Sequence, residues 1–309
     1  MTSTAPHILV IGSANVDFTV KVERLPQVGE TVSGGDFLLS YGGKGANQAL
    51  AALLAGAPVF MIAKLGRDAN GESLYRQLTA AGVNAQGLLR DATAPGGVAL
   101  IMVDAQGHNL IATAPGSNQR LTVADIRALD ASAFVGGILL TQLETPLETV
   151  AYGLQRALEQ GMTTILNPAP GRLLSPDFLA LPQIITPNET EASLLSGLAV
   201  TDLDTARRAG ERLLALGCRT VIITLGAQGS LLVRQGGVQH FPPFPVTPID
   251  TTAAGDAFNG VLAAALLEGR SLDEAIVRAN AAGALCVTKR GAQEALPTRQ
   301  EVEALLARV

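Results

Sequence analysis

The sequence predicts an α/β fold in which a mostly parallel sheet is covered by helices on both faces. Short β-rich runs with apolar centres alternate with amphipathic helical stretches along most of the chain, and crossover helices of this kind join parallel strands. The chain has 309 residues, of which 48% are hydrophobic and 16% are charged. Because this is enough to bury one large core, we expect a single domain over residues 1–309.

The expected strands and helices alternate in order along the chain. The strand-like runs are residues 7–20, 59–66, 136–144, 163–168, 182–188 and 220–226. The helical stretches are residues 68–82, 146–161, 204–217 and 256–269, and several of them close on a glycine, as helices commonly do. Ligands bind such sheets at the carboxyl ends of the strands, so polar residues that follow a strand are candidate site residues.

Two regions interrupt this alternation. Residues 29–43 and 96–118 are hairpin-like, and the second is centred on the turn "DAQGHN". We expect a small β-sheet lid, formed by segments of about 14–42 and 96–115 in the N-terminal half, that closes over a site and excludes water. Its apolar runs "VALIMV" and "LIATA" would leave adhesive edges on a monomer, which predicts a homodimer formed through the lid.

Charge and composition argue against several classes of protein. The formal net charge is −5 and no run of Lys or Arg occurs, so a nucleic-acid partner is not expected. The two cysteines, Cys218 and Cys286, are too far apart for a zinc spacing and are expected to be buried apolar residues. No targeting segment and no segment able to span a membrane is found, which favours a cytoplasmic protein without a membrane partner.

Familiar phosphate-binding motifs do not match. In "GGKGAN" a P-loop would need Gly at Leu38 and Ser or Thr at Gly45, and the dinucleotide fingerprint would need Gly at Gln48. No nucleophile elbow is present, and three histidines leave little for a metalloenzyme. These absences reduce the weight of hydrolase and metalloenzyme functions.

Four polar clusters follow the ends of strands, and each also has a purely structural interpretation. "GSANVD" and "GGKGANQA" are either a polar strand end and a glycine turn or a polar site whose backbone a ligand can approach. In "PNETEA", Asn188 and Glu191 have the spacing of a helix cap as well as that of groups near a phosphate or a divalent cation. "TLGAQG" is either a β-turn or a phosphate-binding loop.

The stretch "DTTAAGDAFNG" favours the functional interpretation. Ala253, Ala254 and Gly255 carry almost no side chain, so the first N–H groups of the helix at Asp256 to Gly260 are open to an anion. Asp256 is either an N-cap of its own helix or a general base beside a transferred phosphoryl group. The base role would fail if neighbouring amides bound up its oxygens.

These motifs resemble those of ribokinases. "GSANVD", "GGKGANQA", "LNPAP", "PNETEA", "TLGAQG" and "DTTAAGDAFNG" occur in the order and approximate spacing of that family, and the resemblance covers essentially the whole chain. It implies a ribokinase-like three-layer sandwich with a β-sheet lid. It also implies ATP-dependent phosphorylation of the 5-hydroxyl of D-ribose to D-ribose 5-phosphate, with ADP as the other product.

The resemblance also implies roles for individual residues. Asp256 is expected to be the general base, with Gly255, Ala254 and Ala253 forming the anion hole. The residues expected to bind the sugar are Asn15, Asp17, Gly43, Lys44, Asn47, Glu144 and Asp256 itself. Those expected to bind the nucleotide are Asn188, Thr224, Gly226, Gly229, Gly255 and Asn280, with Glu191 ordering Mg²⁺ through water. Those expected at a monovalent-cation site, which suits K⁺, are Asp250, Thr252, Cys286, Lys289, Gly291 and Ala295.

Two positions depart from the expected pattern. Ala253 stands where many sugar kinases carry Gly, although ribokinases often have Ala, so the anion hole is still expected from Gly255 and the backbone. Thr113 stands on the lid where an apolar residue against the sugar is expected. The substrate could therefore be 2-deoxyribose or another pentose. A nucleoside or fructose kinase and a non-catalytic sugar-binding regulator are two further possible classes, and the intact "GSANVD", "GGKGAN" and Asp256 motifs argue against both.

Overall fold

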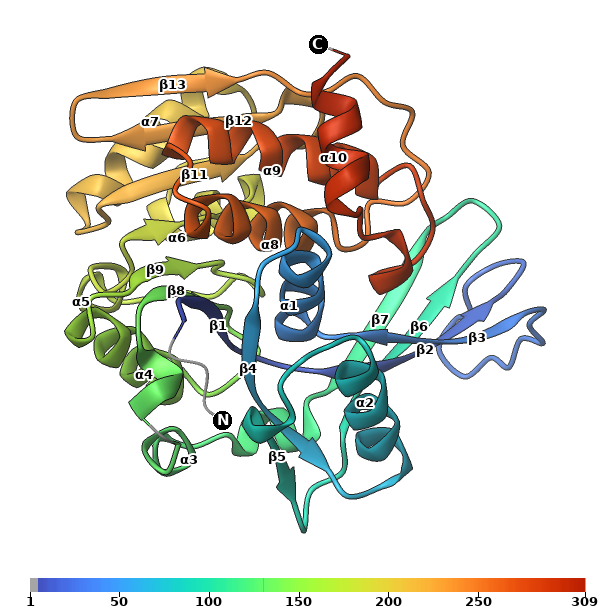
Figure 1. Cartoon of the computed structure of the whole chain (residues 1–309). Coiled ribbons are helices and arrows are strands. Elements are labelled where there is room, and N and C mark those ends of the chain that lie inside the picture. The colour runs from blue at the N-terminus through green and yellow to red at the C-terminus, as the bar shows by residue number, and fades with distance from the viewer. Residues whose placement is uncertain (1–4, 130, 309) are drawn as a thin grey trace.

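A large twisted sheet forms the centre of the protein in the computed structural model, which describes residues 5–129 and 131–308 (Figure 1). Within those residues its strand order is β13-β12-β11-β10-β9-β8-β1-β4-β5. The strands are β1 (His7–Ile11), β4 (Val59–Gly66), β5 (Leu88–Asp91), β8 (Gly137–Thr141), β9 (Thr163–Leu166), β10 (Ile184–Ile185), β11 (Thr220–Thr224), β12 (Ser230–Arg234) and β13 (Gly237–Phe241). Pairing is parallel from β5 to β11 and antiparallel from β11 to β13.

Helices cover both faces of this sheet (Figure 1). On one face lie α1 (Lys44–Leu54), α2 (Ala69–Ala80), α8 (Ala254–Leu267), α9 (Leu272–Cys286) and α10 (Arg299–Leu306). On the other face lie α3 (Val123–Arg127), α4 (Leu147–Glu159), α5 (Pro176–Leu179), α6 (Glu189–Ser196) and α7 (Leu203–Ala215). Along β1, Ile8 and Val10 join the first core and Leu9 and Ile11 join the second, which is the alternation that a doubly covered strand requires.

The predicted helices end where their sequences indicate. Gly82, Gly161 and Gly217 follow α2, α4 and α7 at positive φ, a conformation that glycine adopts without steric penalty. At the start of α2 the Asp68 side chain accepts a hydrogen bond from the Gly71 N–H and caps the helix. Local sequence therefore sets these boundaries.

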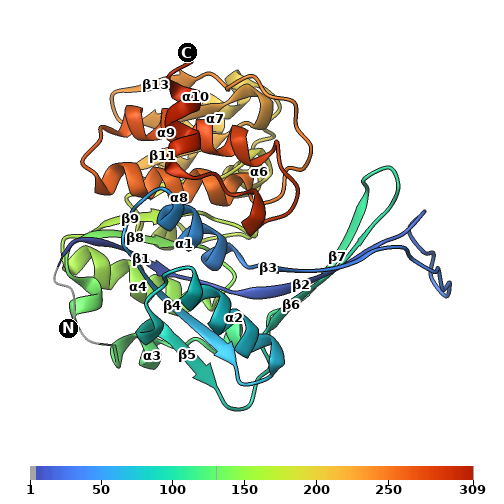
Figure 2. The same ribbon diagram turned by 45° about the vertical axis from the view of Figure 1, so that its right-hand side comes forward.

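A second, small sheet projects from the body (Figure 2). Its order is β3-β2-β6-β7, made of β2 (Asn15–Lys21), β3 (Phe37–Gly42), β6 (Gly97–Val103) and β7 (Asn109–Ala114). β2 and β6 pair in parallel, while β2 with β3 and β6 with β7 pair antiparallel. The β6–β7 hairpin predicted around "DAQGHN" is confirmed.

The structure corrects two predicted elements and adds two strands that were not predicted. The run 7–20 is two strands in different sheets, because the chain breaks at Gly12 to Ala14 and crosses from β1 to β2. Residues 29–36 are not strand, and β3 pairs with β2 rather than within residues 29–43. β5 and β13, the two edge strands, were not predicted.

The cysteines and the helix lengths also bear on the predictions from sequence. Cys218 and Cys286 are free and buried, as expected for small apolar residues. Among the helices of the described residues, none has both the length and the apolarity needed to cross a bilayer.

Candidate functional site

The first turn of α8 presents bare backbone N–H groups. The helix begins at Ala254, two residues earlier than predicted, so Asp256 is its third residue. Within the described residues, the N–H groups of Gly255 and Asp256 have no hydrogen-bond partner, while the Ala257 N–H donates to the Ala253 carbonyl at 2.8 Å. Gly255 is exposed, and a Cβ built on it would meet no atom within 4 Å. An anion can therefore approach the positive end of this helix.

Ala253 adopts a backbone conformation that makes this approach open. It is the only described residue other than glycine at positive φ (φ 59°, ψ 9°), and its side chain offers no capping group. A left-handed alanine costs roughly 1 to 2 kcal/mol. The small residue and the turned backbone leave the next N–H groups unblocked.

Asp256 does not cap its own helix. Its Oδ2 accepts a hydrogen bond from the Asn47 Nδ2 at 2.9 Å, and its Oδ1 accepts one from the Gln48 Nε2 at 2.9 Å. Contrary to expectation, amides of two consecutive α1 side chains do engage its oxygens, and they hold the carboxylate from behind. A carboxylate has about four lone-pair sites, so acceptor capacity remains on both oxygens.

The charge of Asp256 is finely balanced by its surroundings. The side chain is 6% exposed, and burial raises the pKa of its carboxyl above the usual range. The Lys44 ammonium and the two side-chain amides oppose this rise in pKa, and the Glu144 carboxylate adds to it. A buried carboxylate that is raised in pKa yet held by donors is suited to accept a proton near neutral pH.

Lys44 lies among carboxylates. Burial alone would lower its pKa, but Asp256, Glu144 and Glu191 raise the pKa above its ordinary value, so the ammonium stays charged. The Lys44 backbone N–H donates to the Glu144 Oε2 at 3.0 Å, and the Ser13 hydroxyl donates to the same oxygen. The start of α1 and the segment after β8 are thus joined through Glu144.

Glycine at position 43 is required for this arrangement. Its φ is +88°, and a Cβ there would lie 2.7 Å from the Ala14 Cα and 2.8 Å from the Asn15 nitrogen. Any side chain would push the start of α1 away from the start of β2. The glycine turn is therefore part of the site's geometry.

Asp17 and Asn15 lie on β2, where the small sheet meets the body. Burial, followed by the Glu144 and Glu294 carboxylates, raises the pKa of Asp17 to about 6. The Asn15 Oδ1 accepts a hydrogen bond from the Asn118 Nδ2 at 2.8 Å. In the sheet register Asp17 pairs with Ala99, and Ala99 pairs with Thr113, so Asp17 and Thr113 point to the same face.

The residues expected at the nucleotide come together at the ends of β11 and β12. Asn188 forms a parallel bridge with Thr224, and the Asn280 Nδ2 donates to the Phe241 carbonyl at 3.4 Å. A Cβ on Gly229 would lie 2.1 Å from that same carbonyl oxygen. Gly226 follows Thr224 in the turn between β11 and β12, in η4 (Gly226–Gln228).

Asn188 and Glu191 form the helix cap that their spacing indicates. The Asn188 Oδ1 accepts from the Glu191 N–H at 2.8 Å, and the Glu191 Oε2 accepts from the Asn188 N–H at 3.0 Å. Burial raises the pKa of Glu191, and the Asn188 N–H and the Lys44 ammonium lower it. The structural interpretation of this motif is realised, and one carboxylate oxygen of Glu191 remains outside the reciprocal cap.

Most of the expected cation-site residues are adjacent. The Asp250 Oδ1 accepts from the Thr252 N–H at 2.9 Å, its Oδ2 accepts from the Gly291 N–H at 3.0 Å, and the Cys286 thiol donates to the Thr252 carbonyl at 3.5 Å. The Lys289 ammonium instead pairs with Glu301 at 2.7 Å. Ala295, fully buried in η5 (Gln293–Ala295), follows the same loop.

Sequence reasoning missed three amides and one carboxylate that lie beside the predicted residues. Gln48 contacts Asp256, Gln142 contacts Gln48, and the Gln293 Nε2 donates to the Asn47 Oδ1 at 3.1 Å. Glu294 acts on Asp17 through its charge. Gln48 stood inside the quoted motif "GGKGANQA", but the motif offered no reason to separate it from the buried alanines around it.

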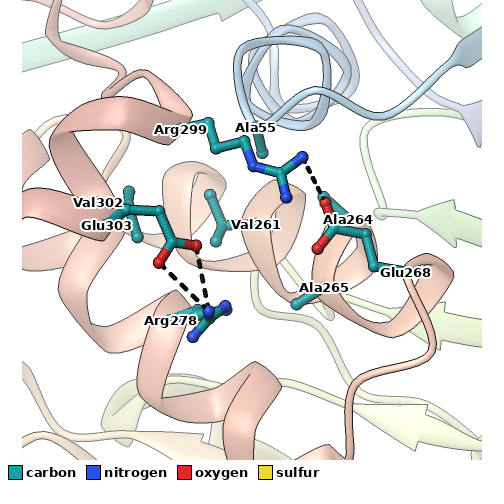
Figure 3. A pocket seen from close by; sticks show the side chains of 9 residues that line it. All are labelled: Ala55, Val261, Ala264, Ala265, Glu268, Arg278, Arg299, Val302 and Glu303. Carbon is teal, nitrogen blue, oxygen red and sulfur yellow. Dashed lines mark hydrogen bonds and ion pairs between the residues drawn. The ribbon is translucent and has the colours of Figure 1, made fainter. Parts of the chain in front are cut away.

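A small pocket elsewhere on the molecule is separate from these residues. It holds about 20 Å³ between α8, α9, α10 and the end of α1. Two ion pairs form part of its lining, Arg299 with Glu268 at 2.8 Å and Arg278 with Glu303 at 3.1 Å (Figure 3). This volume admits roughly one water molecule. The pocket is part of the packing of these helices.

Known proteins are similar to this chain in fold and in sequence. Residues 5–299 match the pfkB family carbohydrate kinases. The ribokinase of Haemophilus influenzae is 42% identical over 294 residues, covering 95% of this chain and 96% of that protein. The structure of Arabidopsis thaliana ribokinase complexed with ribose and ATP has a TM-score of 0.90 and 32% identity, covering 98% of this chain and 99% of that chain. The deoxyribokinase of Salmonella typhi is 33% identical over 301 residues, covering 97% and 98% respectively.

The chain therefore belongs to the pfkB family of carbohydrate kinases. The predicted resemblance to ribokinases and the predicted ribokinase-like fold, with a mostly parallel sheet, flanking helices and a small second sheet, are confirmed.

Proposed function

We propose that this protein transfers the γ-phosphoryl group of ATP to the 5-hydroxyl of D-ribose, giving D-ribose 5-phosphate and ADP. The observation that carries the proposal is the first turn of α8, where a buried carboxylate lies beside two N–H groups that have no partner among the described residues. Similarity to ribokinases over nearly the full length supports D-ribose as the acceptor.

In this mechanism Asp256 takes the proton of the sugar hydroxyl as the hydroxyl oxygen attacks phosphorus. The N–H groups of Gly255 and Asp256, with the helix dipole, stabilise the negative charge on the transferred group. Ala254 and Ala253 keep the approach open, because neither carries a side chain beyond Cβ. Asn47 donates a hydrogen bond to one oxygen of the carboxylate from behind.

The sugar would be held by hydrogen bonds to its hydroxyl groups. We assign Asp17, Asn15, Lys44, Asn47 and Glu144 to this role, with the Gly43 backbone beside them. Their side chains gather where β2, the start of α1 and the segment after β8 meet. A site that pairs each hydroxyl discriminates against an analogue lacking one, because a buried polar group is then left unpaired.

The nucleotide would lie along the ends of β11 and β12. We assign Asn188, Thr224, Gly226, Gly229 and Asn280 to it, and their adjacency supports this assignment. Glu191 would order Mg²⁺ through water. Among the described residues no group of three or more His, Cys, Asp or Glu side chains could hold a metal. A magnesium ion bound beside Glu191 would take its other ligands from phosphate oxygens and water.

The segment from Asp250 to Thr252 and the loop after α9, which a hydrogen bond from the Gly291 N–H to Asp250 joins, fit a monovalent cation. The Asp250 carboxylate and the backbone carbonyl groups from Cys286 to Ala295 are oxygen donors, which suit K⁺. The Lys289 side chain is engaged with Glu301, so only its carbonyl would contribute. A bound cation would steady the segment that leads into α8.

The small sheet, from segments of about 14–42 and 96–115, would act as a lid on the single domain and as the interface of a homodimer. Large apolar side chains are exposed on it: Phe37 (62%), Leu38 (51%), Leu39 (46%), Leu100 (57%), Leu110 (48%) and Ile111 (57%). A projecting sheet with so much apolar surface favours a partner.

The two free thiols agree with a cytoplasmic location, where thiols stay reduced.

One assay tests the proposal. ADP release is measured with D-ribose, 2-deoxyribose, fructose and adenosine as acceptors, each in K⁺ and in Na⁺, and the sugar product is identified. The proposal predicts the highest kcat/KM for D-ribose and higher activity in K⁺. The main competing acceptor is 2-deoxyribose, because a 33% identical relative is a deoxyribokinase. A higher kcat/KM for 2-deoxyribose would replace D-ribose as the proposed substrate. ADP release with none of the four would contradict a sugar kinase of this class.

A further inference from the structure

Gln48 lies directly behind Asp256 and is completely buried. Its Nε2 donates to the Asp256 Oδ1 at 2.9 Å and to the Asn167 Oδ1 at 3.0 Å, while its Oε1 accepts from the Gln142 Nε2 at 2.6 Å. Both N–H groups and the oxygen of this amide are therefore engaged. The side chain cannot rotate without leaving a buried polar atom unpaired.

The hydrogen bonds continue from Gln48 back to the helix that carries Asp256. The Asn167 Nδ2 donates to the Thr186 carbonyl at 3.1 Å, the Thr186 hydroxyl donates to the Asn259 Oδ1 at 2.7 Å, and the Asn259 Nδ2 donates to the Gly255 carbonyl at 2.8 Å. These side chains are at most 7% exposed. This series of hydrogen bonds begins at the Asp256 carboxylate and ends at the Gly255 carbonyl on the first turn of α8.

We propose that Gln48 is a positioning residue, which fixes the direction of the Asp256 carboxylate relative to the bare N–H groups of the same helix turn. Asn47 alone would hold the carboxylate by one oxygen and leave it free to turn about that bond. Gln48 supplies the second anchor, and Asn167, Thr186 and Asn259 tie that anchor to α8. The inference rests on the proposed function in that it assumes Asp256 to be the base.

The electrostatic surroundings give Gln48 a second effect. The charged and titratable groups that interact electrostatically with Asp256 are Lys44, Glu144, Glu191 and Cys286. Burial raises the pKa of Asp256, and the Gln48 amide lowers it by donating to the ionised form. Removing the donor should therefore raise this pKa.

The test compares Gln48→Met with Gln183→Met. Both changes replace a glutamine by a side chain of similar length, but the Gln183 Oε1 accepts from the Thr164 N–H, remote from Asp256. For Gln48→Met we expect kcat to fall roughly 10- to 100-fold, since small misplacements of reacting groups have effects of this size. The KM for the sugar should stay within about threefold, because Gln48 is too buried to touch it.

Two further readouts separate positioning from general damage. The acidic limb of the kcat/KM profile should move to higher pH in Gln48→Met and stay unchanged in Gln183→Met. A ¹³C NMR titration of the Asp256 carboxyl, with its signal assigned by comparison with Asp256→Asn, measures this pKa without substrate. It should show a higher pKa for Asp256 in Gln48→Met than in the unchanged protein. This titration stands even if the acceptor is another sugar, so failure of the proposed substrate is distinguishable from failure of this inference.

A second variant covers the case in which Gln48→Met does not fold. Gln48→Glu keeps the shape and places a carboxyl against Asp256, and adjacent carboxylates raise the pKa of one of them. Its acidic limb should lie above that of the unchanged protein. A profile in either variant that superimposes on that of the unchanged protein, with kcat within threefold of it, would overturn the proposal.

Discussion

Replacing Asp256 by Asn tests the base directly, because the change preserves shape and removes the proton-accepting group. Asn has one side-chain oxygen, whereas Asn47 and Gln48 present donors to both oxygens of Asp256. One donor would then face an NH₂ group, and an unpaired buried donor costs about 1–3 kcal/mol. Removal of a buried charge offsets part of this, so the variant should fold.

Loss of a positioned general base lowers kcat by roughly 10²- to 10⁴-fold, which corresponds to about 2.7–5.4 kcal/mol of transition-state stabilisation. Sugar binding should change little, because Asp17, Lys44 and Glu144 remain.

The assay is steady-state ADP release with a calorimetric measurement of ribose affinity, alongside Asp177→Asn, an exposed aspartate of α5, as the matched control. The control should keep full activity. If Asp256→Asn retains kcat within tenfold of the unchanged protein while folded, Asp256 is not the base.

Three other predictions follow from single observations. Gly255→Ala should fold, since a Cβ there meets nothing within 4 Å, but it should lower kcat at least tenfold by obstructing the anion; an unchanged kcat would remove this N–H from the anion site. Ribose affinity, measured by calorimetry without nucleotide, should weaken as pH falls through about 6, where Asp17 gains its proton, and Asp17→Asn should abolish this pH dependence. Ala253→Gly should raise Tm by roughly 1–2 °C, because relief of a left-handed alanine exceeds the added entropy of the unfolded chain; a lower Tm in thermal unfolding would refute this reasoning.

The fold was predictable where it depends on local sequence signals, namely hydrophobic periodicity and the glycines that end helices. The alternation of apolar strands with amphipathic helices, and the glycines that end α2, α4 and α7, identified the parallel sheet and its coverage. The crossing from β1 to β2 was not predictable, because residues 7–20 were interpreted as one strand-like run. The break depends on close packing of Gly12 against Gly45, where a Cβ would lie 2.7 Å from the Gly45 Cα. Long-range contact, rather than composition, divides this run between two sheets.

The site was predictable only in part for the same reason. The small residues before Asp256 indicated open N–H groups, but the helix starts two residues earlier, since a left-handed alanine carries no capping signature. The partners of Asp256 could not be read from its own segment. Gln48 is about 200 residues away in sequence, and a buried glutamine in a run of alanines looks like core until its contacts are known.

The central claim is that the Asp256 carboxylate and the N–H groups of the first α8 turn act on the same reacting atoms. The most direct measurement is a crystal structure with D-ribose and a non-hydrolysable ATP analogue. The account predicts the ribose 5-hydroxyl within about 2.6–3.2 Å of a free acceptor site on Asp256 and a γ-phosphate oxygen on the Gly255 N–H. A 5-hydroxyl remote from Asp256, or a γ-phosphate bound away from this turn, would contradict it.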